Sequence, residues 1–249
     1  MPRVHSHRTS SALFAGDIYQ GPVVASQPCG HGEWRSGVDG STYLGQFDAG
    51  KRHGQGALKL ADGGVMEGEW LNGELEGYAE ISLADGFRYS GLFQLGQRHG
   101  NGIAYYPSGA SYDGEWRCDL RCGHGLWVAG ASVQSGAELT PADEDETGEV
   151  PTRYVGQWAE GRRCGRGSLS YLSGASYVGD FGPQELYDGH GVLCASDGSK
   201  YDGQWQEGAH HGKGMRLLRG AFRTRALQPV ITHLSAGFKL TMHVQLQAF

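Results

Sequence analysis

The stretch Tyr201-Asp-Gly-Gln-Trp-Gln-Glu-Gly-Ala-His-His-Gly-Lys-Gly214 decides the fold of this chain. It places Tyr201, Gly203 and Trp205 two residues apart, and residues two apart on a strand share one face of a sheet. Each glycine inside a helix would cost about 1 kcal/mol relative to alanine. The stretch therefore predicts a strand with tyrosine, glycine and tryptophan on one face, a turn, and a second strand.

The pattern aromatic-x-Gly-x-aromatic recurs along the chain. Clear copies start at Tyr43, Tyr89, Tyr112, Tyr154, Tyr177 and Tyr201, and looser copies start at Phe14 and Met66. Most starts are 23 or 24 residues apart, and most copies continue into a third Gly, a Gly-x-Gly pair and an Asp-Gly or Ser-Gly dipeptide. Such dipeptides suit the positive φ angles of tight hairpin turns. Each copy thus predicts one β-hairpin, and eight copies predict sixteen strands.

Composition supports this interpretation. The chain has 43 glycines in 249 residues, where about 17 are expected at the average frequency of roughly 7%. Its 6 Trp, 12 Tyr and 8 Phe argue against a disordered glycine-rich linker. Glycine between two aromatic residues leaves room for a ring from the neighbouring strand to lie flat on the backbone. Three positions depart from the pattern, since Asp119 and Gln184 replace the third Gly and Ala79 replaces the second Gly of a pair.

The motif Tyr-x-Gly-x-Trp-x-x-Gly-x-x-x-Gly-x-Gly, with its period of 23 residues, resembles the MORN repeat (membrane occupation and recognition nexus). The copy at 201–214 matches it throughout. The resemblance covers roughly residues 14–214 and implies an all-β fold, an elongated single-layer antiparallel β-hairpin repeat array in the form of a solenoid or half-pipe with a groove. The first copy, at Phe14, is degenerate and has a long turn.

The chain divides into five segments. Residues 1–13 are expected to be a disordered N-terminus, 14–130 repeats one to five, 131–152 an acidic insertion loop and 153–214 repeats six to eight. Residues 215–249 form a basic tail without the repeat, in which apolar and polar residues alternate from Phe238 to Gln247. Alternation of this kind indicates an amphipathic strand, which we expect to cap the array.

The expected function is that of a non-catalytic scaffold. No catalytic or metal-binding motif is present, no cofactor is expected, and the net charge of −6 gives no basic field for nucleic acid. An odd number of cysteines without a signal peptide favours a cytoplasmic protein. A protein partner, as an extended peptide or a helix, is expected in an aromatic groove. The residues predicted to line that groove are Tyr89, Phe93, Tyr112, Trp116, Tyr154, Trp158, Tyr201 and Trp205.

The family resemblance points to a cytoskeletal assembly, a cilium or flagellum, or the inner face of a membrane. Three further interpretations remain open. An apolar patch on the opposite face suggests a second contact surface or self-association, through Ile103, Tyr105, Leu126 and Val128. Anionic phospholipid, including phosphoinositide, is an alternative ligand for Arg216, Arg219, Arg223 and Arg225. The chain could also be a regulatory fragment of a lipid kinase or methyltransferase.

Overall fold

The computed structural model describes residues 16–134 and 149–218. Contacts within the chain define two units, residues 1–125 and residues 126–249, which we describe one at a time. The charged stretch from Glu138 to Glu146 and the expected capping strand lie outside the described residues.

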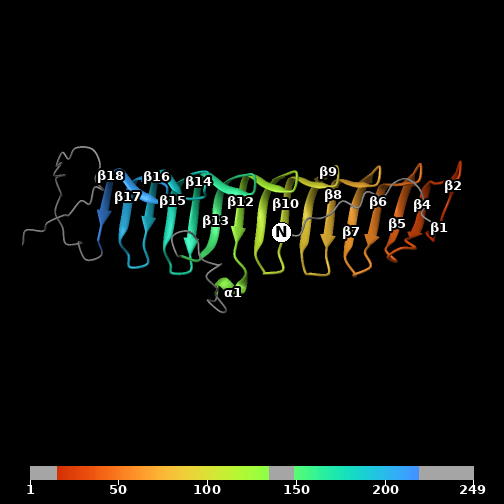
Figure 1. Ribbon diagram of the computed structural model, residues 1–249, viewed down its shortest axis with the longest axis horizontal. Coiled ribbons are helices and arrows are strands. Elements are labelled where there is room, and N and C mark those ends of the chain that lie inside the picture. The colour runs from red at the N-terminus through yellow and green to blue at the C-terminus, as the bar shows by residue number, and fades with distance from the viewer. Residues whose placement is uncertain (1–15, 135–148, 219–249) are drawn as a thin grey trace, which may run out of the picture. The chain divides into compact units, whose positions relative to one another are not determined.

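Unit 1 is built from strands that follow one another along the chain (Figure 1). They are β1 (Ile18–Gln20), β2 (Val23–Val24), β3 (Gln27–Pro28), β4 (Gly30–Arg35), β5 (Thr42–Asp48), β6 (Lys51–Lys59), β7 (Val65–Leu71), β8 (Glu74–Ser82), β9 (Arg88–Gln94), β10 (Gln97–Tyr105), β11 (Ser111–Arg117) and β12 (Leu120–Val128), whose last residues belong to unit 2. The short strands β2 and β3 pair only with each other.

Unit 2 continues the same plan after a short helix (Figure 1). Its elements are α1 (Ala131–Gln134), β13 (Pro151–Ala159), β14 (Arg162–Tyr171), β15 (Ser176–Phe181), β16 (Tyr187–Cys194), β17 (Lys200–Gln206) and β18 (Ala209–Leu217). Within the described residues sixteen strands make one open sheet in the order β1, β4 and then β5 to β18. This confirms the predicted all-β array of antiparallel hairpins.

The two ends of the hairpins use different turns. The predicted Asp-Gly and Ser-Gly turns are confirmed, with φ of 95° at Gly63 and 81° at Gly109. At the other end, successive residues such as Ala49 and Gly50 both have positive φ, 45° and 78°. Two adjacent positive φ angles characterise the type I′ turn, whose twist matches that of the strands it joins.

A β-bulge interrupts six of the described hairpins, namely β5–β6, β7–β8, β9–β10, β13–β14, β15–β16 and β17–β18. Between β5 and β6 the pairing runs from Gly45↔Gly56 to Phe47↔Arg52, so the register shifts by two residues. The first glycine of the pair, Gly54, lies in the bulge with a φ of 58°, and bulges bend the strand that carries them. Gln46 Oε1 accepts a hydrogen bond from the Gln55 amide at 3.3 Å. The Gln46 side chain on β5 thus accepts a hydrogen bond from a backbone amide of β6 that the bulge removes from the strand pairing.

Two assignments from the sequence are corrected. The first repeat begins at Tyr19 and not at Phe14, because the Tyr19 ring covers Gly21 and Gly32 as later tyrosines cover their own glycines. Glu185, and not Gln184, occupies the place of the third Gly, with a φ of 64°. The turn after Phe181 has one residue more than the turns of the other copies that follow the first one. The position of the third Gly therefore comes one residue later than the motif spacing predicts.

Candidate interaction surface

One face of the sheet, called here the tyrosine face, is built on rings that lie over glycines. A Cβ added to Gly102 would be 2.2 Å from Tyr89 Oη, and one added to Gly91 would be 2.7 Å from it. The ring therefore covers a glycine of its own strand as well as one of the neighbouring strand, which extends the prediction. Tyr89 Oη donates to the Leu92 carbonyl at 3.1 Å. The same bond, to the carbonyl three residues on, recurs at Tyr19, Tyr43, Tyr112, Tyr154, Tyr177 and Tyr201.

Edge-to-face contacts join a tyrosine to its own hairpin and to the next one, at Tyr43, Tyr89, Tyr154 and Tyr177. The Tyr89 ring lies 5.1 Å from the Phe93 ring and 5.6 Å from the Trp116 ring, at interplanar angles of 83° and 88°. Tyr177 repeats this with Phe181 and Trp205. Such pairs contribute about 0.5–1.5 kcal/mol beyond the burial of their area. The rings thus form the core that successive hairpins share.

In several hairpins an arginine on the strand that follows the turn completes this core. The Arg98 guanidinium lies 4.2 Å from the centre of the Trp116 ring, and Trp116 Nε1 donates to the Gly102 carbonyl at 3.0 Å. Arg52 lies over Trp70 at 4.3 Å in the same way and donates to the Gly73 carbonyl at 2.8 Å. These arginines were not singled out from the sequence, although both stand two residues before the first Gly of a pair.

The residues predicted to line a groove are buried against one another. Tyr112 and Tyr154 have no exposed surface, and Tyr89, Phe93, Trp116, Trp158 and Trp205 are at most 5% exposed. Tyr201 alone is half-buried. Burial raises the pKa of Tyr43 to about 12 and raises the pKa of Tyr112, Tyr154 and Tyr177 further. The structure gives these aromatic side chains a packing role, while partner binding by them stays a prediction.

The opposite face, called here the open face, carries the accessible side chains. In unit 1 its large exposed apolar residues include Ile18, Leu44, Leu71, Tyr78, Leu92 and Tyr105, which are between 42% and 56% exposed. In unit 2 they are Val155, Val178 and Met215. None of these except Tyr105 was proposed from the sequence, because the strand period of two places them on the side opposite the repeat's signature residues.

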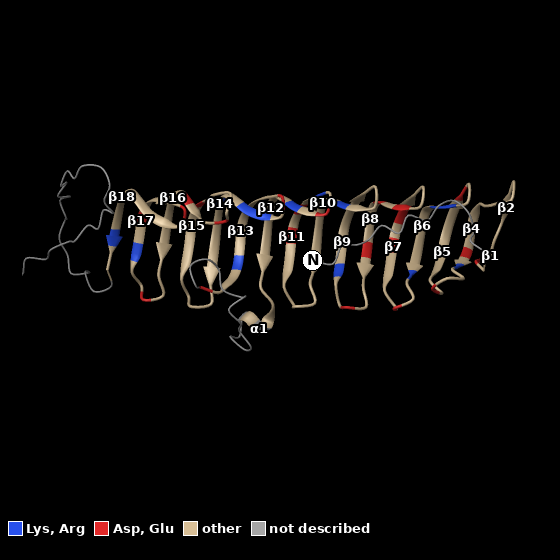
Figure 2. Cartoon of the chain, in the orientation of Figure 1, with Lys and Arg blue, Asp and Glu red and all other residues tan. Residues whose placement is uncertain are grey.

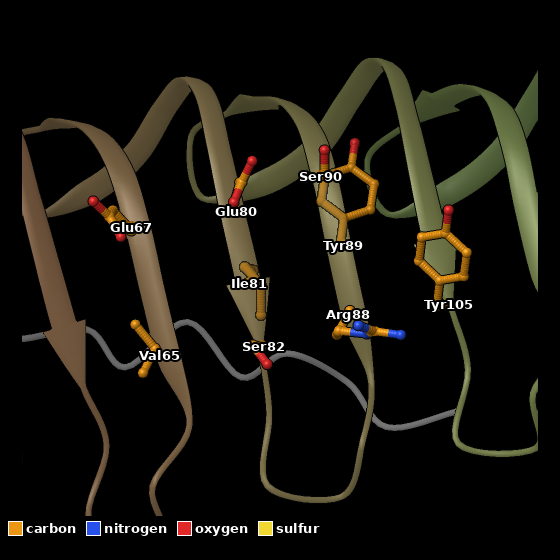
Figure 3. A pocket seen from close by; sticks show the side chains of 9 residues that line it. All are labelled: Val65, Glu67, Glu80, Ile81, Ser82, Arg88, Tyr89, Ser90 and Tyr105. Carbon is orange, nitrogen blue, oxygen red and sulfur yellow. The ribbon is translucent and has the colours of Figure 1, made fainter.

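The open face of unit 1 also holds a pocket of about 530 Å³ over β7 to β10 (Figure 3). Glu67 and Glu80 lie at one level on adjacent strands, and Val65, Ser82 and Arg88 lie at the next level (Figure 3). Red segments on β7 and β8 beside a blue segment on β9 show the same division of charge (Figure 2).

Only some residues of the other predicted surfaces lie in the described part of the chain. On the open face of unit 1, Ile103 is half-buried and Tyr105 exposed; in unit 2, Leu126 and Val128 are half-buried. Their role as one contact patch stays a prediction. Arg216 is exposed on β18, whereas Arg219, Arg223 and Arg225 lie outside the described residues. No helix in 16–134 or 149–218 is long and apolar enough to cross a bilayer.

Comparison with curated proteins finds a similar segment in a much larger protein. The chain is 29% identical over 170 residues to alsin of Rattus norvegicus and 28% identical to alsin of Homo sapiens. Each match covers 66% of this chain and 7% of the relative. The chain therefore spans only a small part of the length of the curated relatives it matches.

Among solved structures, the TCP10 domain of Danio rerio CPAP has a TM-score of 0.28 and 12% identity, over 76% of this chain and 78% of that domain. The TCP domain of Drosophila melanogaster SAS-4, in complex with a proline-rich motif of Ana2, has a TM-score of 0.29 and 10% identity, over 59% and 77%. At these scores we infer nothing about this chain from either structure.

The MORN repeat family model matches six segments, namely residues 43–65, 67–88, 89–111, 112–128, 154–176 and 201–218. These are the copies at Tyr43, Met66, Tyr89, Tyr112, Tyr154 and Tyr201. The hairpin of β15 and β16 lies outside the matched segments but has the same tyrosine bond, bulge and ring contacts. With about half of its residues in matched repeats and the same architecture between them, the chain belongs to the MORN repeat family.

Proposed function

We propose that this chain is a non-catalytic protein-interaction scaffold and that its partner lies on the open face. Membership in a repeat family whose hairpins build a continuous surface supports the first part. The second part rests on access, because the tyrosine face is filled by its own rings whereas the open face presents apolar side chains to solvent.

The observation that carries the proposal is a pair of exposed apolar residues. Tyr78 on β8 and Leu92 on β9 are register partners, and they are 53% and 42% exposed. Single exposed apolar residues are ordinary on a protein surface, but neighbouring ones grouped on one face mark an interaction site. In unit 2 the exposed Val178 is the register partner of the half-buried Val192.

The finer proposals come from the family resemblance. They are that the partner is an extended peptide or a helix, and that the scaffold works in a cytoskeletal, ciliary or membrane-adjacent assembly. Binding of anionic lipid by the basic segment stays a second prediction. Liposome flotation with and without residues 215–249 tests it, and equal flotation of the two forms would contradict it.

Proximity labelling in the native cell tests the proposal when wild type is compared with Leu44→Glu/Leu92→Glu. Leu92 stands where the next hairpin has Glu115, whose Oε1 accepts a hydrogen bond from the His124 amide at 2.9 Å, so a glutamate suits this position of the fold. Leu95→Glu is the matched control, because Leu95 is 70% exposed in a turn off the open face.

We expect the double variant to lose a set of labelled proteins that the Leu95→Glu variant keeps. Identical labelling by wild type and the double variant, with both folded by circular dichroism, would show that the partner does not use the open face.

A further inference from the structure

The pocket over β7 to β10, called here the glutamate pocket, contains two carboxylates at paired positions of adjacent strands. Glu67 on β7 and Glu80 on β8 are direct register partners, and both are exposed. Like charges directly opposite on neighbouring strands destabilise a sheet. In the part of the chain that the structure describes, neither carboxylate has an ion pair. The arrangement is therefore unfavourable for the isolated chain and becomes favourable when a cation is placed between the two groups.

Two hydroxyl groups hold one of these carboxylates in place. Tyr78 Oη donates to Glu80 Oε1 at 3.0 Å, and Ser90 Oγ lies 2.9 Å from Tyr78 Oη. Because the single hydroxyl proton of Tyr78 goes to Glu80, Ser90 is the donor to Tyr78. This chain occupies one oxygen of Glu80 and leaves the other one available. The receiving group is thus fixed before any ligand arrives, which lowers the entropic cost of binding.

The other lining residues determine which shape and charge of ligand the pocket accepts. Val65 lines the pocket one level along β7, and Tyr105 forms the far wall on β10. The Arg88 guanidinium lies 5.4 Å from the centre of the Tyr105 ring, at the level next to the two glutamates (Figure 3). A cationic ligand is attracted to the glutamates and repelled from Arg88. Its charged group therefore lies at the level of the glutamates, and its apolar part lies at the level of Val65.

From this geometry we propose that the glutamate pocket binds an arginine or lysine side chain of an extended partner peptide, with an apolar residue of that peptide against Val65. The proposal deepens the scaffold function above and rests on it. An arginine suits two neighbouring carboxylates well, because its planar guanidinium has donors on both sides. The alternative of a divalent cation is disfavoured, since calcium takes 6–8 oxygen ligands, and it is tested as a separate arm below.

The test uses the full chain and a phage library of random nine-residue peptides as the probe. We expect the selected peptides to share an arginine or lysine flanked by an apolar residue. Binding of a selected peptide, measured by calorimetry, is expected to fall at least tenfold in Glu67→Gln/Glu80→Gln and to weaken as salt is raised. Replacing the peptide's cation with norleucine should weaken binding to wild type and have little further effect on that variant.

The matched control is Glu33→Gln/Asp113→Asn, which removes two exposed acidic residues from the same face of unit 1 outside the pocket. It should bind the peptide within twofold of wild type. Tyr78→Phe should weaken binding by a smaller factor, because Glu80 remains but loses its hydrogen-bond donor. The Glu67→Gln/Glu80→Gln variant should melt no lower than wild type, which separates loss of binding from loss of the fold.

The outcomes are distinguishable. Selected peptides without a shared cation, or peptides that bind Glu67→Gln/Glu80→Gln as well as wild type, would overturn the pocket and leave the scaffold function standing. Equal loss of binding in Glu67→Gln/Glu80→Gln and Glu33→Gln/Asp113→Asn would show that binding depends on the overall negative charge and not on the pocket. Competition by Ca²⁺ at low millimolar concentration, with no selected cation, would assign the site to metal. A library that yields no binder would count against the pocket and the scaffold function together.

Discussion

Arg98 Nε donates a hydrogen bond to Asp119 Oδ1 at 2.8 Å, from one hairpin to the turn of the next. Asp119 has a φ of 66° and occupies the place that glycine holds in most other copies. Arg163 and Glu185 repeat the arrangement at 2.7 Å, with a φ of 64° at Glu185. Each departure from the third Gly of the repeat therefore places an acid beside an arginine of the preceding hairpin.

Replacing Asp119 with glycine should lower the free energy of unfolding by about 1–2 kcal/mol. Removing one member of a buried ion pair costs about 3–5 kcal/mol, and the loss is smaller here because Asp119 is 31% exposed and because glycine relieves about 1 kcal/mol of left-handed strain. Urea denaturation at pH 7 measures it. Glu207→Gly, at a φ of 48°, is the control and should be neutral or stabilising. An equal gain in both variants would show that the ion pair contributes nothing.

Met66 and Ala79 should prove energetically coupled. Copy three has methionine in place of tyrosine and alanine in place of the glycine that a tyrosine ring would cover, and the Ala79 Cβ already lies close to Gly68. Met66→Tyr alone should destabilise the chain by about 1–3 kcal/mol through overpacking. Combined with Ala79→Gly, it should recover most of that loss. Additive effects of the two substitutions in a double-mutant cycle would refute the coupling.

Glycines of the repeat should differ in how they tolerate alanine. Gly102→Ala would place a Cβ 2.2 Å from Tyr89 Oη and 2.5 Å from Tyr89 Cζ, so we expect a loss of about 3 kcal/mol or more from forced repacking. Gly63→Ala has open space around the new Cβ and should cost only about 1–2 kcal/mol for its positive φ. Thermal unfolding monitored by near-ultraviolet circular dichroism compares them. Similar losses of stability at both sites would mean that packing of the tyrosine ring is not the reason for glycine at position 102.

Stability should fall in alkaline solution. Desolvation raises the pKa of Tyr43 to about 12, although the nearby Arg52 charge partly opposes it, whereas an unfolded tyrosine has a pKa of about 10. Because the folded state keeps its proton longer, the stabilising contribution is complete below about pH 10 and is lost as the pH rises through about 12. Melting temperatures from pH 8 to 12, with tyrosinate absorbance at 295 nm, measure this. Tyr43→Phe should reduce the slope, and an unchanged slope would exclude Tyr43 as a contributor.

The sequence predicted the hairpins, their turns and their faces because these depend on local periods and on single residues. It did not predict the bulge at Gly54 or the role of Gln46, since both depend on the register between strands. Tyr19 was missed because β2 and β3 lengthen the first turn beyond the repeat. The open-face residues Tyr78, Leu92, Glu67 and Glu80 occupy variable positions of the repeat, so their significance emerged only when pairing brought them side by side.

Within each unit a tyrosine contacts a ring of the hairpin that follows, as Tyr43 contacts Trp70 and Tyr177 contacts Trp205. Tyr201 has no such ring among the described residues and stacks instead on His210 at 3.8 Å. Since each hairpin is closed mainly by its successor, unfolding should begin at the β18 edge and proceed one hairpin at a time. Amide protons should therefore exchange with solvent in an ordered series, earliest in β17 and β18 and later toward the interior of unit 2.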